Sequence, residues 1–184
     1  MTTRTAITYY GDRVGTPGTL LTFFIWPGAA KGGPGTGEPV AVAFAIPEGS
    51  LNWWKQRLRG AGFEVLAAGR RFGPEVIEVR DPDGMAVELI ESTAVRESEY
   101  SSPGGIPQSH AITAIHSVTL SLRDERRSTA LLTGEMTFAR IDSDDDRLRL
   151  QAGEAQGATF VDIVKPASAV RGRMGAGTIH HIAF

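Results

Sequence analysis

The sequence predicts an α+β protein made of tandem β-α-β-β-β units, and three observations carry that prediction. Between residues 40 and 91, an apolar run is followed by an amphipathic segment and by three short β-type runs. The last two runs flank residues 81–84 (Asp-Pro-Asp-Gly), where Pro pre-sets φ and Gly accepts a positive φ, as a tight reversal requires. Similar strand starts and strand ends then recur along the chain at nearly constant spacing. Together these features predict curved sheets of mixed and antiparallel strands.

Composition and charge exclude several classes of protein. The 184 residues suffice for one large domain or two small ones with a sizeable core. The formal net charge of -2 gives no electrostatic basis for binding nucleic acid or an anionic membrane, and the apolar runs are strand-sized. Because the chain has no cysteine, it has no disulfide, thiolate metal site or Cys nucleophile. We therefore expect a cytoplasmic protein with neither nucleic acid nor membrane as a partner.

The N-terminal region predicts a β-hairpin. Residues 6–10 and 19–25 are rich in β-forming side chains, and a loop that contains Gly and Pro joins them. Residues 27–39 follow with so many Gly and Pro residues that we expect a linker or a mobile loop.

The first complete unit contains a predicted helix after its opening strand. Ser50 is a suitable N-cap, and Gly60 and Gly62 are suitable stop signals. Apolar side chains fall on one face of this helix, at Leu51, Trp54 and Leu58. Large aromatic residues at such positions usually fill the core, so we expect Trp53 and Trp54 to pack structurally and not to form a ligand platform.

The second half of the chain repeats the order of strands around a helix. After a polar connection, the sequence predicts a strand, a helix, three short strands, a Gly-rich turn and a final strand. Their ranges are 111–122, 124–133, 136–141, 147–150, 159–164, 171–178 and 178–184.

Internal repeats explain this order. The strand starts that align are Ala41-Val-Ala-Phe, His116-Ser-Val-Thr and His181-Ile-Ala-Phe. The strand ends that align contain Glu88, Thr22 and, less closely, Asp162. Start and end lie 47 positions apart in the first complete unit (Ala41 to Glu88) and 46 apart in the next (His116 to Asp162).

The repeat divides the chain into five parts. They are the tail of a first unit (1–28), a complete unit (39–93), a linker (94–110), a third unit (111–166) and the first strand of a fourth unit (178–184). Because the first and last units lack strands on this spacing, we expect a chain that is cut at both ends.

These segments resemble the vicinal-oxygen-chelate superfamily, which includes glyoxalase I, bleomycin-resistance proteins and type I extradiol dioxygenases. The general resemblance rests on the DPDG turn that closes one unit and the H-H-I-A-F strand that opens another. Five segments are similar, in the same order, to the branch that opens hydroquinone-type and related phenolic rings. They are GTPGTLLTFFIWPG (15–28), AIPEGSLNWW (45–54), FGPEVIEVRDPDG (72–84), IHSVTLSL (115–122) and GAGTIHHIAF (175–184).

The resemblance implies an extradiol-type, ring-cleaving dioxygenase that acts on a hydroquinone- or catechol-type phenol and O2. In that family two His and one Glu hold one Fe(II), or Mn(II), on one face and leave positions open for a phenolate and O2. His181 heads the H-x-A-F strand and matches a metal ligand. His180 matches a neighbouring acid–base group, and the two-residue strand period directs it to the face opposite His181 unless the strand is bulged.

The rest of the metal site is less evident. On the repeat spacing, the carboxylate ligand would lie about 47 positions after His181, beyond Phe184. His116 lies 65 positions before His181 and is either the second ligand or a histidine satisfied within its strand, the more common case. Glu88 occupies the superfamily's carboxylate position, but Ala41 stands where its His would be. We therefore expect Glu88 to be buried and hydrogen-bonded, and not to be a ligand.

Other functions stay open at this point. A metal-dependent isomerase or lyase of the glyoxalase kind would need a metal but no O2. A non-catalytic protein that binds a small molecule, like bleomycin-resistance proteins, would need neither. Units of this superfamily commonly pair between chains, so we expect a homodimer or a higher oligomer that could complete the site. Four arginines could meet an anionic substrate, although we expect a solvated surface role for each: Arg70, Arg71, Arg171 and Arg173.

Overall fold

The computed structural model describes residues 6–93, 103–144, 146–152, 160–166 and 170–184. Its strands are β1 (Ala6–Tyr10), β2 (Leu21–Ile25), β3 (Glu38–Ile46), β4 (Leu66–Arg70), β5 (Glu75–Arg80), β6 (Ala86–Glu91), β7 (Ala114–Ser121), β8 (Ala139–Ser143), β9 (Arg147–Gln151) and β10 (Phe160–Val164). Its α-helices are α1 (Leu51–Gly60) and α2 (Arg126–Gly134), and short 3-10 helices cover Pro103–Gly105 and Gln108–His110. Parts of the predicted linker (94–102) and of the predicted third unit (145 and 153–159) lie outside the described residues.

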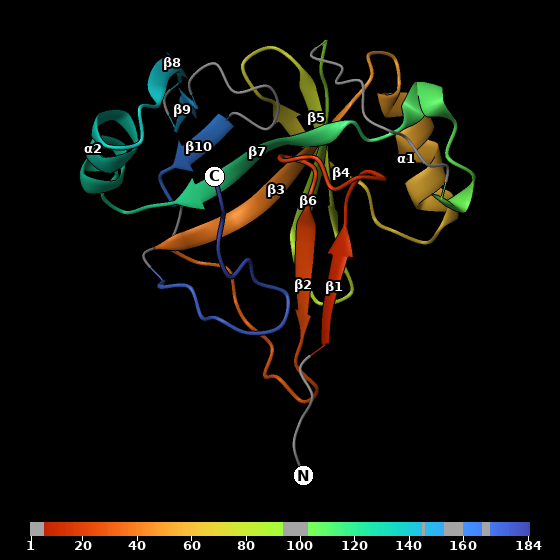
Figure 1. Cartoon of the computed structure of the whole chain (residues 1–184), viewed down its shortest axis with the longest axis horizontal. Helices are drawn as coiled ribbons and strands as arrows, with labels where there is room; N and C mark the ends of the chain where they lie inside the picture. The colour runs from red at the N-terminus through yellow and green to blue at the C-terminus, as the bar shows by residue number, and fades with distance from the viewer. Residues whose placement is uncertain (1–5, 94–102, 145, 153–159, 167–169) are drawn as a thin grey trace.

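Two β-α-β-β-β units form one eight-stranded sheet in the order β4-β5-β6-β3-β7-β10-β9-β8. In each unit the first strand lies parallel to the last one, β3 to β6 and β7 to β10, and the other pairings are antiparallel. The antiparallel pairing of β3 with β7 joins the two units. The predicted α+β fold of tandem units is confirmed. Figure 1 shows the helices at opposite ends of this sheet and the β1–β2 hairpin projecting from it.

Apolar side chains fill the sheet face that the helices cover. Leu132 of α2 packs against one buried cluster, and Trp54 of α1 packs against another. The first cluster contains Val42, Val118, Phe138, Leu148, Leu150, Val161 and Ile163, and the second contains Ile46, Leu51, Ile77 and Leu89. Because strand side chains alternate between faces, the residues between these positions point to the other face, which we call the polar face. No helix among the described residues is long and apolar enough to cross a membrane.

The start of α1 differs in one detail from the prediction. Ser50 is at the N-cap position, but its side chain makes no capping hydrogen bond. The carboxylate of Glu91 accepts the Leu51 N–H instead, at 2.8 Å. The Ser50 hydroxyl lies 3.0 Å from Nδ1 of His110, and the Trp54 indole N–H donates to the His110 carbonyl at 2.8 Å. His110, in the segment before β7, therefore holds the Ser50 side chain that would otherwise cap α1, and it attaches α1 to the start of the unit that β7 opens.

The predicted reversal between β5 and β6 is confirmed. Oδ1 of Asp81 accepts the N–H groups of Asp83, Gly84 and Met85 at 2.7–3.0 Å. Gly84 has a φ of 101°, which favours glycine. The strand expected over 136–141 begins later, at Ala139, because the N–H of Phe138 still bonds to the α2 carbonyl of Leu132.

The Gly-rich residues 27–39 form an ordered contact with a second Gly-rich segment, and the mobile loop considered above is not what the structure shows. Gly33 and Arg173 exchange backbone hydrogen bonds at 2.8 and 2.9 Å, and further backbone bonds join 30–36 to 170–176. A Cβ at Gly175 would lie 2.4 Å from the Ala30 carbonyl oxygen, so this approach requires glycine. The paired segments bring residues 178–184 beside the end of β2 (Figure 1).

Candidate functional site

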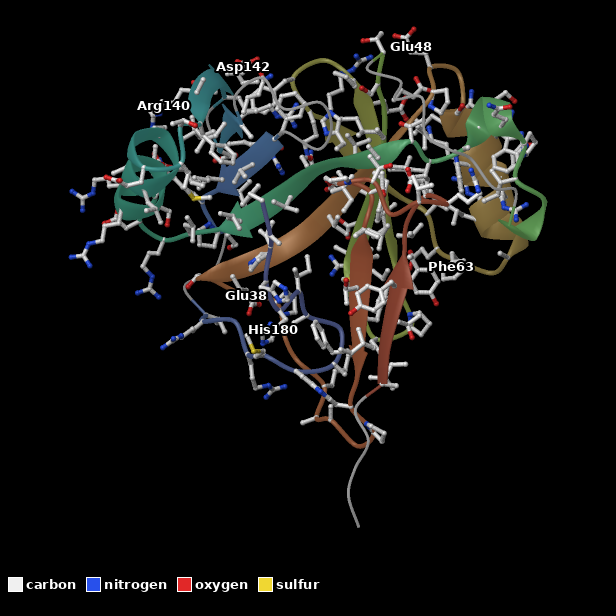
Figure 2. The ribbon with its side chains drawn as sticks, in the orientation of Figure 1. Glu38, Glu48, Phe63, Arg140, Asp142 and His180 are labelled. Carbon is white, nitrogen blue, oxygen red and sulfur yellow. The ribbon has the colours of Figure 1, made fainter. Side chains whose placement is uncertain are left out.

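Two neighbouring imidazoles, which we call the imidazole pair, form the first part of the candidate site. The Nδ1 atoms of His180 and His181 lie 2.9 Å apart, so one ring donates its N–H to the lone pair of the other. Their ring planes are nearly perpendicular, at 88°. Both side chains are exposed, and Figure 2 shows His180 on the C-terminal segment.

His180 and His181 do not point to opposite faces of a strand, so that prediction is wrong. Residues 178–184 pair with no strand among the described residues, and the strand predicted there is absent. Ile179 and Ile182 both pack against the first apolar cluster. Because three positions separate these anchors, the two-residue alternation is lost. Both imidazoles lie against Phe24, with ring centroids 6.0 and 5.9 Å away.

Aromatic side chains at the end of β2, which we call the aromatic wall, form the second part. The wall consists of Phe24 and Trp26, whose ring centroids are 6.0 Å apart. Trp26 meets His180 edge-on at 6.2 Å. Strand alternation places Thr22 on the face of Phe24, whereas Phe23 points to the opposite face and packs against Tyr10. The hairpin thus presents one aromatic face to the imidazole pair.

The imidazole pair fits the implied metal only in part. Imidazole nitrogens are suitable ligands for Fe(II) and Mn(II), and His181 can supply one. Within the described ranges, however, no group of three or more His, Cys, Asp or Glu side chains is placed to hold a metal ion. The described residues therefore do not make the complete set of two His and one Glu. What they offer is a surface for an aromatic ring beside groups that can exchange a proton.

A second group of functional side chains lies on the polar face of the eight-stranded sheet. Arg149 donates to both oxygens of Asp162 at 2.7 Å, and Arg147 donates to Asp162 at 3.0 Å. Arg71 donates to Glu88 at 3.0 Å. We call these five residues the ionic cluster. Asp162 and Glu88 are almost fully buried, at 1% and 4% exposure, so their charges require these partners.

The charges of the ionic cluster are not balanced. Three guanidinium groups and two carboxylates give these five residues a net charge of +1. Burial and the neighbouring charge of Arg71 lower the pKa of Arg147, and Asp162 and Glu88 oppose that shift. A buried cationic group repels a divalent metal. The cluster is therefore unsuited to a metal site, although its carboxylates come from the last strand of each unit.

Aromatic rings enclose the guanidinium of Arg149. It lies 4.5 Å from the ring centre of Phe72 and 4.9 Å from that of Phe160, both within cation–π range. Phe72 has a φ of 51°, a left-handed conformation that costs a non-glycine residue of order 1–3 kcal/mol. The contacts of Phe72 and Arg71 with the sheet therefore hold the β4–β5 connection over the polar face.

His116 lies beside the ionic cluster. It takes no part in the ring contacts described for the imidazole pair. Its Nδ1 is 3.1 Å from the Ser117 hydroxyl, and its ring packs on Phe160 at 4.9 Å. Burial and the charge of Arg149 lower the pKa of His116 to about 4, although Asp162 acts in the opposite direction. The neutral imidazole is thus a packed member of the sheet, and these surroundings favour the structural interpretation over a ligand role.

The structure confirms some of the expectations for individual residues and corrects others. Glu88 is buried and ion-paired, as expected, but Arg71 is its partner and not a solvated surface residue. Trp54 is buried and Trp53 stacks on His110 at 4.8 Å, which confirms their structural role. The aromatic wall was not predicted as a site. Its signal was present in the F-x-W spacing, which places two rings on one strand face.

Known proteins similar in sequence are ring-cleaving enzymes, although no family model matches. The chain is 33% identical over 176 residues to MhqE of Bacillus subtilis strain 168, a candidate ring-cleaving dioxygenase. It is 27% identical over 180 residues to a chlorohydroquinone/hydroquinone 1,2-dioxygenase of Sphingobium indicum. These alignments cover 96% of this chain but 57% and 56% of the relatives. The chain therefore spans little more than half the length of the curated relatives it matches.

Two solved structures that are similar to this chain are a candidate dioxygenase and a glyoxalase. A crystal structure of a candidate dioxygenase from Bacillus subtilis superposes with a TM-score of 0.88 at 29% identity, over 96% of this chain and 56% of that one. Glyoxalase I from Zea mays superposes with a TM-score of 0.62 at 15% identity, over 94% of this chain and 57% of that one. At that identity the second likeness concerns the fold alone.

Proposed function

Because this chain has the vicinal-oxygen-chelate fold and its homologues are ring-cleaving dioxygenases, we propose that it acts in the oxidative opening of a hydroquinone- or catechol-type phenol by O2. The observation that carries this proposal is the imidazole pair held against the aromatic wall. A phenolic ring needs an aromatic surface to stack on and a nearby group that exchanges its hydroxyl proton, and this part of the chain offers both.

We propose separate roles for the two imidazoles. His181 is the residue that would bind Fe(II), or Mn(II), which supplies the redox chemistry when bound. His180 is the acid–base group that takes a proton from the phenol hydroxyl and later returns it. Its Nδ1 shares a hydrogen bond with that of His181, and its ring packs against Trp26, which supports this role. His116 has no part in this proposal, since a guanidinium group lies beside it.

A homodimer or a higher oligomer and a cytoplasmic location belong to the same proposal. The motivation for an oligomer is that the described residues supply fewer ligands than the implied metal needs. A second chain could contribute the carboxylate. A strictly monomeric protein that still binds one metal tightly would contradict this part.

A second candidate function is the non-catalytic binding of a small aromatic molecule. The incomplete ligand set within the described ranges favours it specifically. In that case the aromatic wall would bind the ligand and no O2 would be consumed. An isomerase of the glyoxalase kind differs from both candidates, because it would turn over its substrate without O2.

Oxygen uptake tests the proposed reaction. The 184-residue protein is loaded anaerobically with Fe(II), then mixed with hydroquinone or catechol in an oxygen-electrode cell, and the product is quantified by mass. We expect O2 consumption that matches ring-opened product, and loss of it in His181→Gln. His180→Gln should lower the rate by about 100-fold or more, the usual contribution of a general acid–base group.

His116→Gln is the matched control, because it removes the same ring from the ionic cluster's surroundings. We expect it to retain O2 uptake. Equal loss in this variant and in His181→Gln would make His116 the second ligand. Absence of O2 uptake by the metal-loaded protein with both phenols would overturn the dioxygenase proposal and leave aromatic binding as the function.

A further inference from the structure

We propose that Phe24 and Trp26 are the specificity-determining residues of the site, because they form the surface on which the substrate ring stacks. This inference rests on the proposed function and adds the substrate class that the wall selects, a flat and uncharged phenolic ring. Neither residue touches the ionic cluster, and neither is a metal ligand or an acid–base group.

The wall is exposed, unlike the aromatic side chains that lie beneath the helices. Phe24 is 36% exposed and Trp26 is 47% exposed. By contrast, Phe138 and Trp54, which pack beneath the helices, are 5% and 6% exposed. The planes of these two partly exposed rings differ by 30°, so one planar molecule can contact both.

The neighbours of the wall determine what kind of ring it accepts. Its aromatic contacts are with the imidazoles of His180 and His181, and no guanidinium or carboxylate takes part in the ring contacts described for it. A stacked ring therefore gains dispersion and edge-to-face contacts but no ion pair. This favours a neutral phenol over a benzoate or an aliphatic acid.

The same geometry places a stacked ring next to His180. His180 contacts both wall residues, at 6.0 Å from Phe24 and 6.2 Å from Trp26. A ring stacked on the wall therefore lies beside the imidazole that we propose as the acid–base group. The wall supplies orientation, which is the part of catalysis that depends on holding reactants in place.

The hairpin contains a natural control for this proposal. Phe23 neighbours Phe24 in sequence but points to the opposite face, where it packs edge-on against Tyr10 at 5.6 Å. Phe23→Leu and Phe24→Leu remove the same ring from the same strand. Any general weakening of the hairpin should therefore appear in both variants, and loss of stacking only in the second.

Fluorine NMR of the 5-fluorotryptophan-labelled protein tests the proposal without metal or O2. The chain has three tryptophans, and Trp26→Phe identifies the Trp26 resonance. We expect added catechol to shift that resonance alone, because Trp53 and Trp54 lie beside His110. Phe24→Leu should weaken binding about fivefold, and Phe23→Leu should leave it within about twofold, as loss of one aromatic contact predicts. Benzoate should bind more weakly than catechol.

Three results would overturn the proposal. The first is a Trp26 resonance that catechol does not shift, and the second is an equal loss of catechol affinity in Phe23→Leu and Phe24→Leu. The third is a wall covered by a second copy of the chain. Sedimentation would detect that copy as an oligomer that dissociates in Phe24→Leu. Its failure is distinguishable from failure of the proposed reaction. A shifted Trp26 without O2 uptake contradicts only the reaction, and O2 uptake with an unmoved Trp26 contradicts only the wall.

Discussion

The carboxylates of the ionic cluster and Phe24 of the aromatic wall lie on corresponding strands of the repeat, and the two regions have opposite chemical character. The last strands of the two complete units carry Glu88 and Asp162, whereas β2 carries Thr22 at the aligned position. Each buried carboxylate is neutralised by arginine, and the guanidinium groups lie on the polar face. Thr22 has no charge to neutralise, and Phe24 and Trp26 on its face stay exposed.

This difference explains how one fold can carry a structural sheet and a candidate site. A buried carboxylate must bind a cation, and either a metal ion or an arginine can serve. Where the chain supplies the arginine, the position becomes part of the scaffold. Where it supplies neither carboxylate nor arginine, the strand face remains available to a ligand.

The largest expected effect comes from breaking the ionic cluster. Asp162→Asn leaves two guanidinium groups buried without their charge partner, so we expect the free energy of unfolding to fall by about 3–5 kcal/mol. Chemical denaturation measures it. Asp124→Asn breaks the exposed pair with Arg126 and should leave the midpoint unchanged. A small effect of Asp162→Asn would mean that water reaches the cluster.

The second-largest effect is expected from acid, which should destabilise the sheet around His116, beside the ionic cluster. Folding lowers the pKa of His116 from 6.5 to about 4, so the unfolded chain binds the proton more readily in that range. The contribution of His116 is fully present above pH 6.5 and is lost as the pH falls to about 4, by at most about 3 kcal/mol. Denaturation at several pH values should show this slope.

The variant His116→Gln supplies the comparison for that slope. It has no imidazole to titrate at this position, so its stability should depend less on pH between 6.5 and 4. An unchanged slope in the variant would assign the pH dependence to other groups.

A smaller effect should follow from removing the ring that covers Arg149. Phe72→Leu keeps the left-handed backbone but loses the cation–π contact, so we expect a loss of about 1–2 kcal/mol in the free energy of unfolding. Phe63→Leu, on an exposed loop, should cost less. Equal costs for the two variants would mean that the ring of Phe72 contributes only apolar area.

The smallest effect on stability is expected at the aromatic wall. Phe24→Leu should change the free energy of unfolding by no more than about 0.5 kcal/mol, because the ring is partly exposed. The same variant should weaken catechol binding. A destabilisation as large as that of Asp162→Asn would mean that the wall belongs to the scaffold.

The sequence predicted the units well because local signals encode them. The DPDG reversal, the spacing of Leu51 and Trp54 and the two-residue strand period all act within a few positions of one another. The same locality explains the failures. The Ser50 side chain and residues 178–184 take conformations set by distant partners, His110 in one case and the apolar cluster under α2 in the other.

The candidate site was predictable only in part for a similar reason. His180 and His181 were found from the resemblance, but their common direction depends on Ile179 and Ile182 packing three positions apart. Arg147 and Arg149 lie on β9 and Arg71 lies in the β4–β5 connection, whereas the carboxylates lie on β10 and β6. Without the strand order, nothing in the sequence pairs Arg149 with Asp162 or Arg71 with Glu88.

Amide NMR mapping of catechol binding can locate the ligand relative to the two regions. The uniformly 15N-labelled protein is titrated with catechol without metal or O2, and the amide shifts are compared along the chain. We expect the largest changes at residues 22–26 and 178–184, with Arg71, Phe72 and Arg149 unaffected. Changes centred on those three residues would place the ligand at the ionic cluster and would contradict the assignment of the aromatic wall as the functional site.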